Sequence, residues 1–141
     1  MNDFQPISYT DTVTADRPWL ASLVGVQDTN TITLDLTKFT ANTHYVTSAN
    51  PALQGRNVMK SGIPLGKITA SGLYAPYNGA GTDGTENLAG FLVDSIAFGP
   101  ASTKAAGALL WFGEVFADEV PGTFDPATVT STAPGVNIHY R

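Results

Sequence analysis

The sequence lacks most of the residues on which catalysis or metal binding depends. It contains no cysteine, so it offers no thiol nucleophile, no thiolate metal site and no disulfide. Its two histidines, His44 and His139, are far apart in the sequence and not at the spacing of metal ligands. No serine lies in a Gly-x-Ser-x-Gly turn. We therefore expect no enzyme, no catalytic residues, no metal site and no cofactor.

Charge is also scarce. Only 13% of the residues are charged, whereas about 25% is typical of globular domains. The seven basic residues are scattered, and the net charge is −5, so there is no basic stripe that could follow a phosphate backbone. The sequence predicts no nucleic-acid partner. An undercharged surface with fourteen glycines and nine prolines suits a protein that is packed against another molecule better than it suits a free cytosolic enzyme.

Long hydrophobic runs are absent as well. No apolar stretch approaches the ~20 residues that a membrane-spanning helix needs. The first residues, Met1–Pro6, lack the basic and apolar regions of a signal peptide. We expect a soluble protein that is made in a cytoplasm and has no membrane partner.

The patterns that are present indicate a mainly β fold. Residues 31–37 alternate strictly, with Ile32, Leu34 and Leu36 on one face and polar residues on the other. Short apolar segments separated by glycine and proline turns follow at residues 65–70, 73–77, 90–98, 108–116 and 136–140. Asp125-Pro126 predicts one short C-terminal helix of about two turns, from Pro126 to Ala133. The length suggests one domain, with residues 1–25 as an extended N-terminal arm and residues 26–141 as a β-rich body.

The predicted arm contains a β-prone segment with little to bury. Residues Ile7–Thr14 favour an extended conformation. Pro18 begins a helical turn after them, which would place Trp19, Leu20, Leu23 and Val24 on one face. Two interpretations of Trp19 stay open: it fills the core of the body, or it anchors a partner.

The segment 108–116 is apolar on both faces. Leu109, Trp111 and Val115 would share one face of a strand, and Leu110, Phe112 and Phe116 the other. A strand of this kind must be covered on both sides. The second cover is either the core of the same chain or a neighbouring subunit, and for the latter the candidate interface residues are Leu110, Phe112 and Phe116.

The order of elements in the second half resembles that of the head decoration proteins of tailed bacteriophages, the family of the lambda decoration protein. The segments that carry this resemblance are Ile63–Thr69, Gly72–Tyr77, Asp83–Asp94, Ala108–Val115 and the closing Ile138–Arg141. The resemblance covers roughly residues 60–141. Residues 16–45 are similar to the leader of some longer members.

The resemblance implies a β-clip-like small barrel or bent ribbon that assembles as a homotrimer. Such trimers sit on the outer surface of the capsid at local threefold positions and hold subunits of the major capsid protein together. The arm would attach by adding a strand to an exposed capsid edge. The candidate capsid-binding residues are Ile7, Tyr9, Thr10, Val13, Trp19 and Leu20.

Two other functions are open on the sequence alone. The chain could be another small virion protein, from the tail or from head completion. It could also be a free β-barrel that binds carbohydrate, with aromatic side chains as stacking platforms; the candidates for that role are Trp19, Tyr74, Tyr77 and Trp111.

Overall fold

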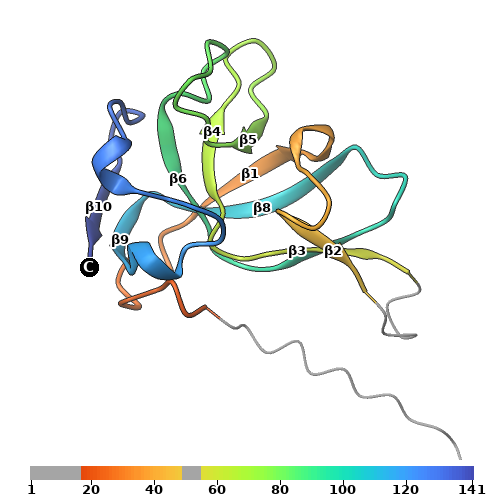
Figure 1. Ribbon diagram of the computed structural model, residues 1–141, viewed down its shortest axis with the longest axis horizontal. Helices are drawn as coiled ribbons and strands as arrows, with labels where there is room; N and C mark the ends of the chain where they lie inside the picture. Colours follow the sequence, from red (N-terminus) through yellow and green to blue (C-terminus); the bar gives the residue numbers. More distant parts are fainter. Residues whose placement is uncertain (1–16, 49–54) are drawn as a thin grey trace, which may run out of the picture.

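A closed barrel of five strands forms the centre of the computed structural model, which describes residues 17–48 and 55–141 (Figure 1). The order around the barrel is β1-β5-β4-β6-β8. The barrel closes where β1 pairs antiparallel with β8 over the whole length of β1, from Asn30 opposite Leu109 to Asp35 opposite Lys104. The mainly β prediction is confirmed. The strands are β1 (Asn30–Asp35), β4 (Pro64–Lys67), β5 (Tyr74–Pro76), β6 (Leu88–Leu92) and β8 (Lys104–Leu110).

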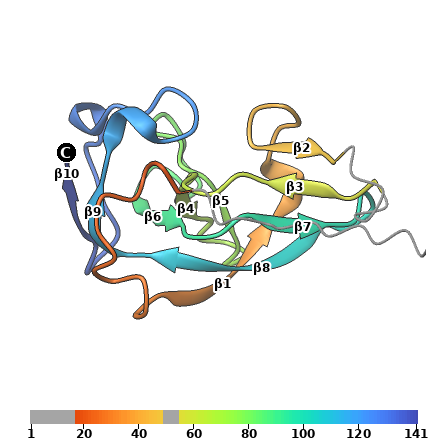
Figure 2. The same cartoon turned by 90° about the horizontal axis from the view of Figure 1, so that it is seen from below.

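Two smaller sheets lie at opposite ends of the barrel (Figure 2). At one end, β2 (Tyr45–Thr47), β3 (Asn57–Met59) and β7 (Ile96–Phe98) form an antiparallel sheet. At the other end, β9 (Phe112–Val115) and the last strand, β10 (Asn137–Tyr140), pair in parallel. No helix in the described part of the chain is long and apolar enough to span a membrane.

The interior of the barrel follows from the alternation in β1. Ile32 and Leu34 point inward and are buried, whereas Thr31 and Thr33 are exposed, as the sequence predicted. Side chains from the other strands and from the adjoining sheet complete this first core; the main ones are Leu36, Phe39, Met59, Ile63, Leu65, Leu92, Phe98 and Leu109.

A second core lies on the outer side of β6 and β8. Phe91 and Leu110 point into it, and Trp19 stacks on Phe91 with ring centroids 6.1 Å apart. Val115 and Val120 complete the cluster. Because Leu109 belongs to the first core and Leu110 to the second, the end of β8 is covered on both sides by its own chain.

The short elements differ from the prediction at several points. The two-turn helix from Pro126 to Ala133 is wrong: Asp125 caps only a single 3-10 turn, η4 (Pro126–Thr128). The residues after it pair with β6 instead, since the Leu88 N–H donates to Ser131 O (3.1 Å) and the Ala133 N–H donates to Leu88 O (2.9 Å). The other two 3-10 turns among the described residues are η1 (Leu36–Lys38) and η3 (Ala117–Glu119).

Candidate interaction surface

The segment before β1 is part of the body. Leu20 forms an antiparallel bridge with Val115, and the Phe116 N–H donates to the carbonyl oxygen of Trp19 (2.7 Å). These contacts occupy the edge of β9 that β10 leaves free. Residues 17–25, which were predicted to belong to the arm, therefore lie along β9, and an arm that leaves the body can begin only before Arg17.

Trp19 fills the core. Its side chain is only 1% exposed, and its indole N–H donates to Ser61 Oγ (3.1 Å). A side chain with so little exposed surface has nothing to offer a partner, so we remove Trp19 from the candidate capsid contacts. Leu20 is half-buried against the same core. The other candidates, Ile7, Tyr9, Thr10 and Val13, lie outside the described residues.

Residues 21–29, here called the apolar loop, expose two large hydrophobic side chains. Leu23 is 79% exposed and Val24 is 60% exposed, more than any other large hydrophobic residue in the described ranges. The sequence pattern placed both on one face with Trp19, but the structure turns Trp19 inward and these two outward.

The apolar loop is held firmly on the body. The Trp111 indole N–H donates to the carbonyl oxygen of Asp28 (2.7 Å). Within the loop, the Val26 N–H donates to Leu23 O (3.3 Å) and the Asp28 N–H donates to Gly25 O (3.1 Å). Gly25 has φ +85°, and a Cβ there would overlap the carbonyl oxygen of Phe112. Apolar side chains on a backbone that is already ordered lose little further freedom on binding, which is typical of interface anchors.

The three candidate trimer-interface residues occupy different environments. Leu110 is fully buried in the second core. It therefore cannot contact a neighbouring subunit, and it is no longer a candidate for the trimer interface. Phe112 is half-buried beneath the apolar loop, with its ring 4.5 Å from that of Trp111. Phe116 is 38% exposed. Two of the three therefore have surface available to a neighbour.

Phe116 lies close to both Pro18, near the start of the described residues, and the last residue, Arg141. It lines one hollow together with Pro18, Asp118, Glu119 and the C-terminal Arg141. The Ala117 N–H donates to the carbonyl oxygen of Arg141 (3.2 Å). We call this surface the terminal face.

An ion pair holds the start of the described chain. Arg17 Nη2 lies 2.9 Å from Asp94 Oδ1, and the Asp94 side chain is 54% exposed. Asp94 thus faces outward. The pair ties the segment that enters the second core to the turn between β6 and β7.

The described residues contain no group of three or more histidine, aspartate and glutamate side chains that could hold a metal ion. His44 has a local structural role, because its Nδ1 accepts a hydrogen bond from the Thr40 N–H (2.9 Å). Burial, and secondarily the charge of Lys60, lowers the pKa of His44.

Sequence reasoning did not single out the exposed pair Leu23 and Val24 as a site. The one local signal is Gly25 directly after them, since a glycine there permits the positive φ that turns the backbone onto β9. That signal shows a turn, but it does not show which side chains the turn exposes.

One family model matches the chain: that described as bacteriophage lambda head decoration protein D, over residues 26–133. The match spans the barrel, the antiparallel sheet of β2, β3 and β7, and β9, and it stops before β10. No curated protein matches the chain.

Proposed function

Because the chain belongs to the family of bacteriophage lambda head decoration protein D, we propose that it binds the outer surface of a phage head as a homotrimer and stabilises the shell. Members of this family are structural proteins of the phage capsid, so the chain is a virion component that binds the capsid. The family match over most of the chain is the observation that carries the proposal. It favours decoration over a role in the tail or in head completion.

The exposed apolar residues support assembly into a trimer. Val24 and the half-buried Phe112 line one hollow, and the exposed Leu23 directly precedes Val24 in the apolar loop. Burying one large aliphatic side chain contributes about 1.5–3 kcal/mol, and a closed threefold ring repeats the contact at every interface. We assign the apolar loop to the contact between subunits.

We assign attachment to the capsid to an N-terminal arm formed by residues 1–16. Its β-prone part places Ile7, Tyr9 and Val13 on one side of an extended segment. Strand addition to an exposed edge of the major capsid protein would supply main-chain hydrogen bonds, and these side chains would supply fit. Three arms on one trimer act together, because binding of the first raises the effective concentration of the others.

The position of Arg17 suggests which side of the body faces the capsid. The described chain starts next to the terminal face, with Pro18 among the residues that line its hollow. An arm that continues from this point reaches a capsid most directly if the terminal face is turned toward it. We assign Phe116 to this capsid-facing side, at the local threefold positions of the shell. Subunits bridged in this way need more free energy to separate, which strengthens the shell against the pressure of packed DNA.

Truncation tests the arm. Deleting residues 1–15 should leave a folded trimer, because the ion pair of Arg17 with Asp94 and the packing of Trp19 in the second core are kept. The truncated protein should no longer pellet with phage heads that lack their own decoration protein, whereas the full chain should pellet with them. Undiminished pelleting of the truncated protein would contradict the assignment of the arm.

Light scattering tests the trimer separately. The full chain should have a mass of about three times 14.8 kDa. A monomer at micromolar concentration would contradict the trimer, and it would leave the test of the arm unaffected.

A further inference from the structure

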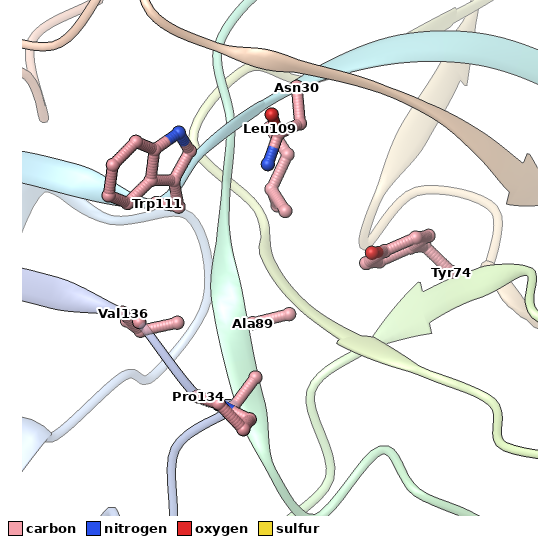
Figure 3. A pocket seen from close by; sticks show the side chains of 9 residues that line it. Asn30, Tyr74, Ala89, Leu109, Trp111, Pro134 and Val136 are labelled. Carbon is pink, nitrogen blue, oxygen red and sulfur yellow. The ribbon is translucent and has the colours of Figure 1, made fainter.

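A cavity opens at one end of the barrel, where β1, β5 and β6 begin and β8 ends (Figure 3). Its volume is about 340 Å³, near the lower limit for small-molecule sites. The segment after η4 closes one side of it. The lining residues are Asn30, Tyr74, Ala89, Leu109, Trp111, Ala133, Pro134, Gly135 and Val136. We call this the barrel-end cavity.

Aromatic side chains lie on two opposite sides of the barrel-end cavity. Figure 3 shows Trp111 on one side and Tyr74 on the other, with the side chains of Leu109 and Ala89 between them. Leu109 and Ala89 are buried (3% and 5% exposed) and form the floor of the cavity, so the half-buried Trp111 and Tyr74 supply the apolar surface that a ring with hydrogens on its faces can cover. Of the four aromatic candidates for sugar stacking, only Tyr74 and Trp111 line this cavity. Trp19 is buried in the second core, and Tyr77 packs against that core.

Two polar side chains at the cavity can each donate and accept hydrogen bonds. They are the amide of Asn30 and the hydroxyl of Tyr74. Neither side chain makes a hydrogen bond to another described residue. Burial raises the pKa of Tyr74, so its hydroxyl keeps the proton that it would donate. A ligand with hydroxyl groups, which also donate and accept hydrogen bonds, can bond to both the Asn30 amide and the Tyr74 hydroxyl.

The remaining features restrict the ligand further. None of the described residues that line the cavity is charged, so nothing there would balance a charged ligand. A proline-rich peptide fits less well, because the indole N–H of Trp111 already donates to Asp28 and is not free to bind a peptide carbonyl.

We propose that the barrel-end cavity binds a neutral saccharide, one or two sugar rings in size. The apolar face of a sugar ring would lie against Trp111, and its hydroxyls would bond to Asn30 and Tyr74. The cavity shares no residue with the terminal face. The site would add glycan binding to a protein whose proposed function is structural.

An NMR titration of the full-length protein tests the proposal. The probes are glucose, galactose and N-acetylglucosamine, with glucuronate as the charged comparison. At least one neutral sugar should produce saturable shifts of backbone amides confined to the residues that line the cavity. Glucuronate should bind more weakly than the neutral sugar.

Two substitutions at the cavity have matched controls. Tyr74→Phe and Asn30→Ala each remove one hydrogen-bonding group, and each should weaken binding by about three- to tenfold. Tyr77→Phe removes a hydroxyl outside the cavity, and Thr31→Ala changes the exposed neighbour of Asn30; both should bind as the unaltered protein does.

Several results would overturn the proposal. They are shifts with none of the sugars, shifts spread away from the cavity, equal loss of binding in the control variants, and tighter binding of glucuronate. Binding of a proline-rich peptide at the cavity in place of any sugar would also refute it. None of these results depends on whether the protein pellets with phage heads.

Discussion

The barrel and the end built on β9 use apolar side chains in different ways. In the barrel, the alternation of each strand determines exposure, and Ile32 and Leu34 are inside because their neighbours face water. At the other end, Trp19 is 1% exposed and Leu23, four positions later, is 79% exposed. Individual contacts decide exposure there, above all the close approach of Gly25 to Phe112. Apolar residues thus stabilise the fold in the first region, while some remain available for binding in the second.

The sharpest test of this difference compares Trp19→Ala with Leu23→Ala. Removing a buried tryptophan side chain should lower the free energy of unfolding by about 3–5 kcal/mol. Leu23→Ala should change it by less than about 0.5 kcal/mol, because Leu23 is almost fully exposed within the subunit. Urea unfolding at a concentration where the protein is monomeric measures both. Equal losses would show that Leu23 also contributes to the core.

Replacing a glycine should cost more in the tightly packed barrel than in a turn. Gly90 in β6 has φ +151°, and a Cβ there would overlap the carbonyl oxygen of Leu110. Strain and overpacking each cost about 1–3 kcal/mol, so Gly90→Ala should lower the melting temperature markedly.

Gly122→Ala is the control for this substitution. Gly122 also has a positive φ, +84°, but nothing lies within 4 Å of a Cβ built on it. The Gly122→Ala variant should lose only about 1–2 kcal/mol of the free energy of unfolding, from backbone strain alone. A Gly90→Ala variant as stable as the Gly122→Ala variant would mean that β6 and β8 can separate without cost.

A charge in the apolar loop should act on assembly and leave the fold intact. Leu23→Glu should weaken the proposed trimer by at least about tenfold, since each buried leucine contributes about 1.5–3 kcal/mol and 1.4 kcal/mol corresponds to a factor of ten. Light scattering over a concentration series measures the shift toward monomer. Thr33→Glu, at an exposed position on β1, is the control and should leave the mass unchanged. An unaltered mass for Leu23→Glu would exclude the apolar loop from the interface.

The smallest expected effect is the pH dependence that His44 confers. Its pKa is lower in the folded chain than the unfolded value of 6.5, because burial, and secondarily the charge of Lys60, disfavours the protonated ring. The unfolded chain therefore binds the proton more readily, and stability should decline as the pH falls below about 6.5. Thermal unfolding between about pH 7.5 and about pH 5, a range that includes the unfolded pKa of histidine, should show this decline. It should be reduced in His44→Ala, and an identical decline in that variant would assign it to other groups.

Much of the barrel could be predicted because its signals are local. The alternation in residues 31–37 and the reversal at Ser71-Gly72, where Gly72 has φ +73°, depend only on neighbouring residues. The parallel pairing of β1 with β5 could not be predicted, since it joins residues far apart in sequence. The same limit applies to the candidate site: hydrophobicity does not distinguish the buried Leu110 from the exposed Phe116.

The most direct test of the central claim is an image of phage heads decorated with this protein, at a resolution that separates subunits. The account predicts three copies around each local threefold position on the outer surface, with Leu23 and Val24 between copies and the terminal face toward the shell. Single copies, density inside the head, or density only at a tail vertex would contradict it.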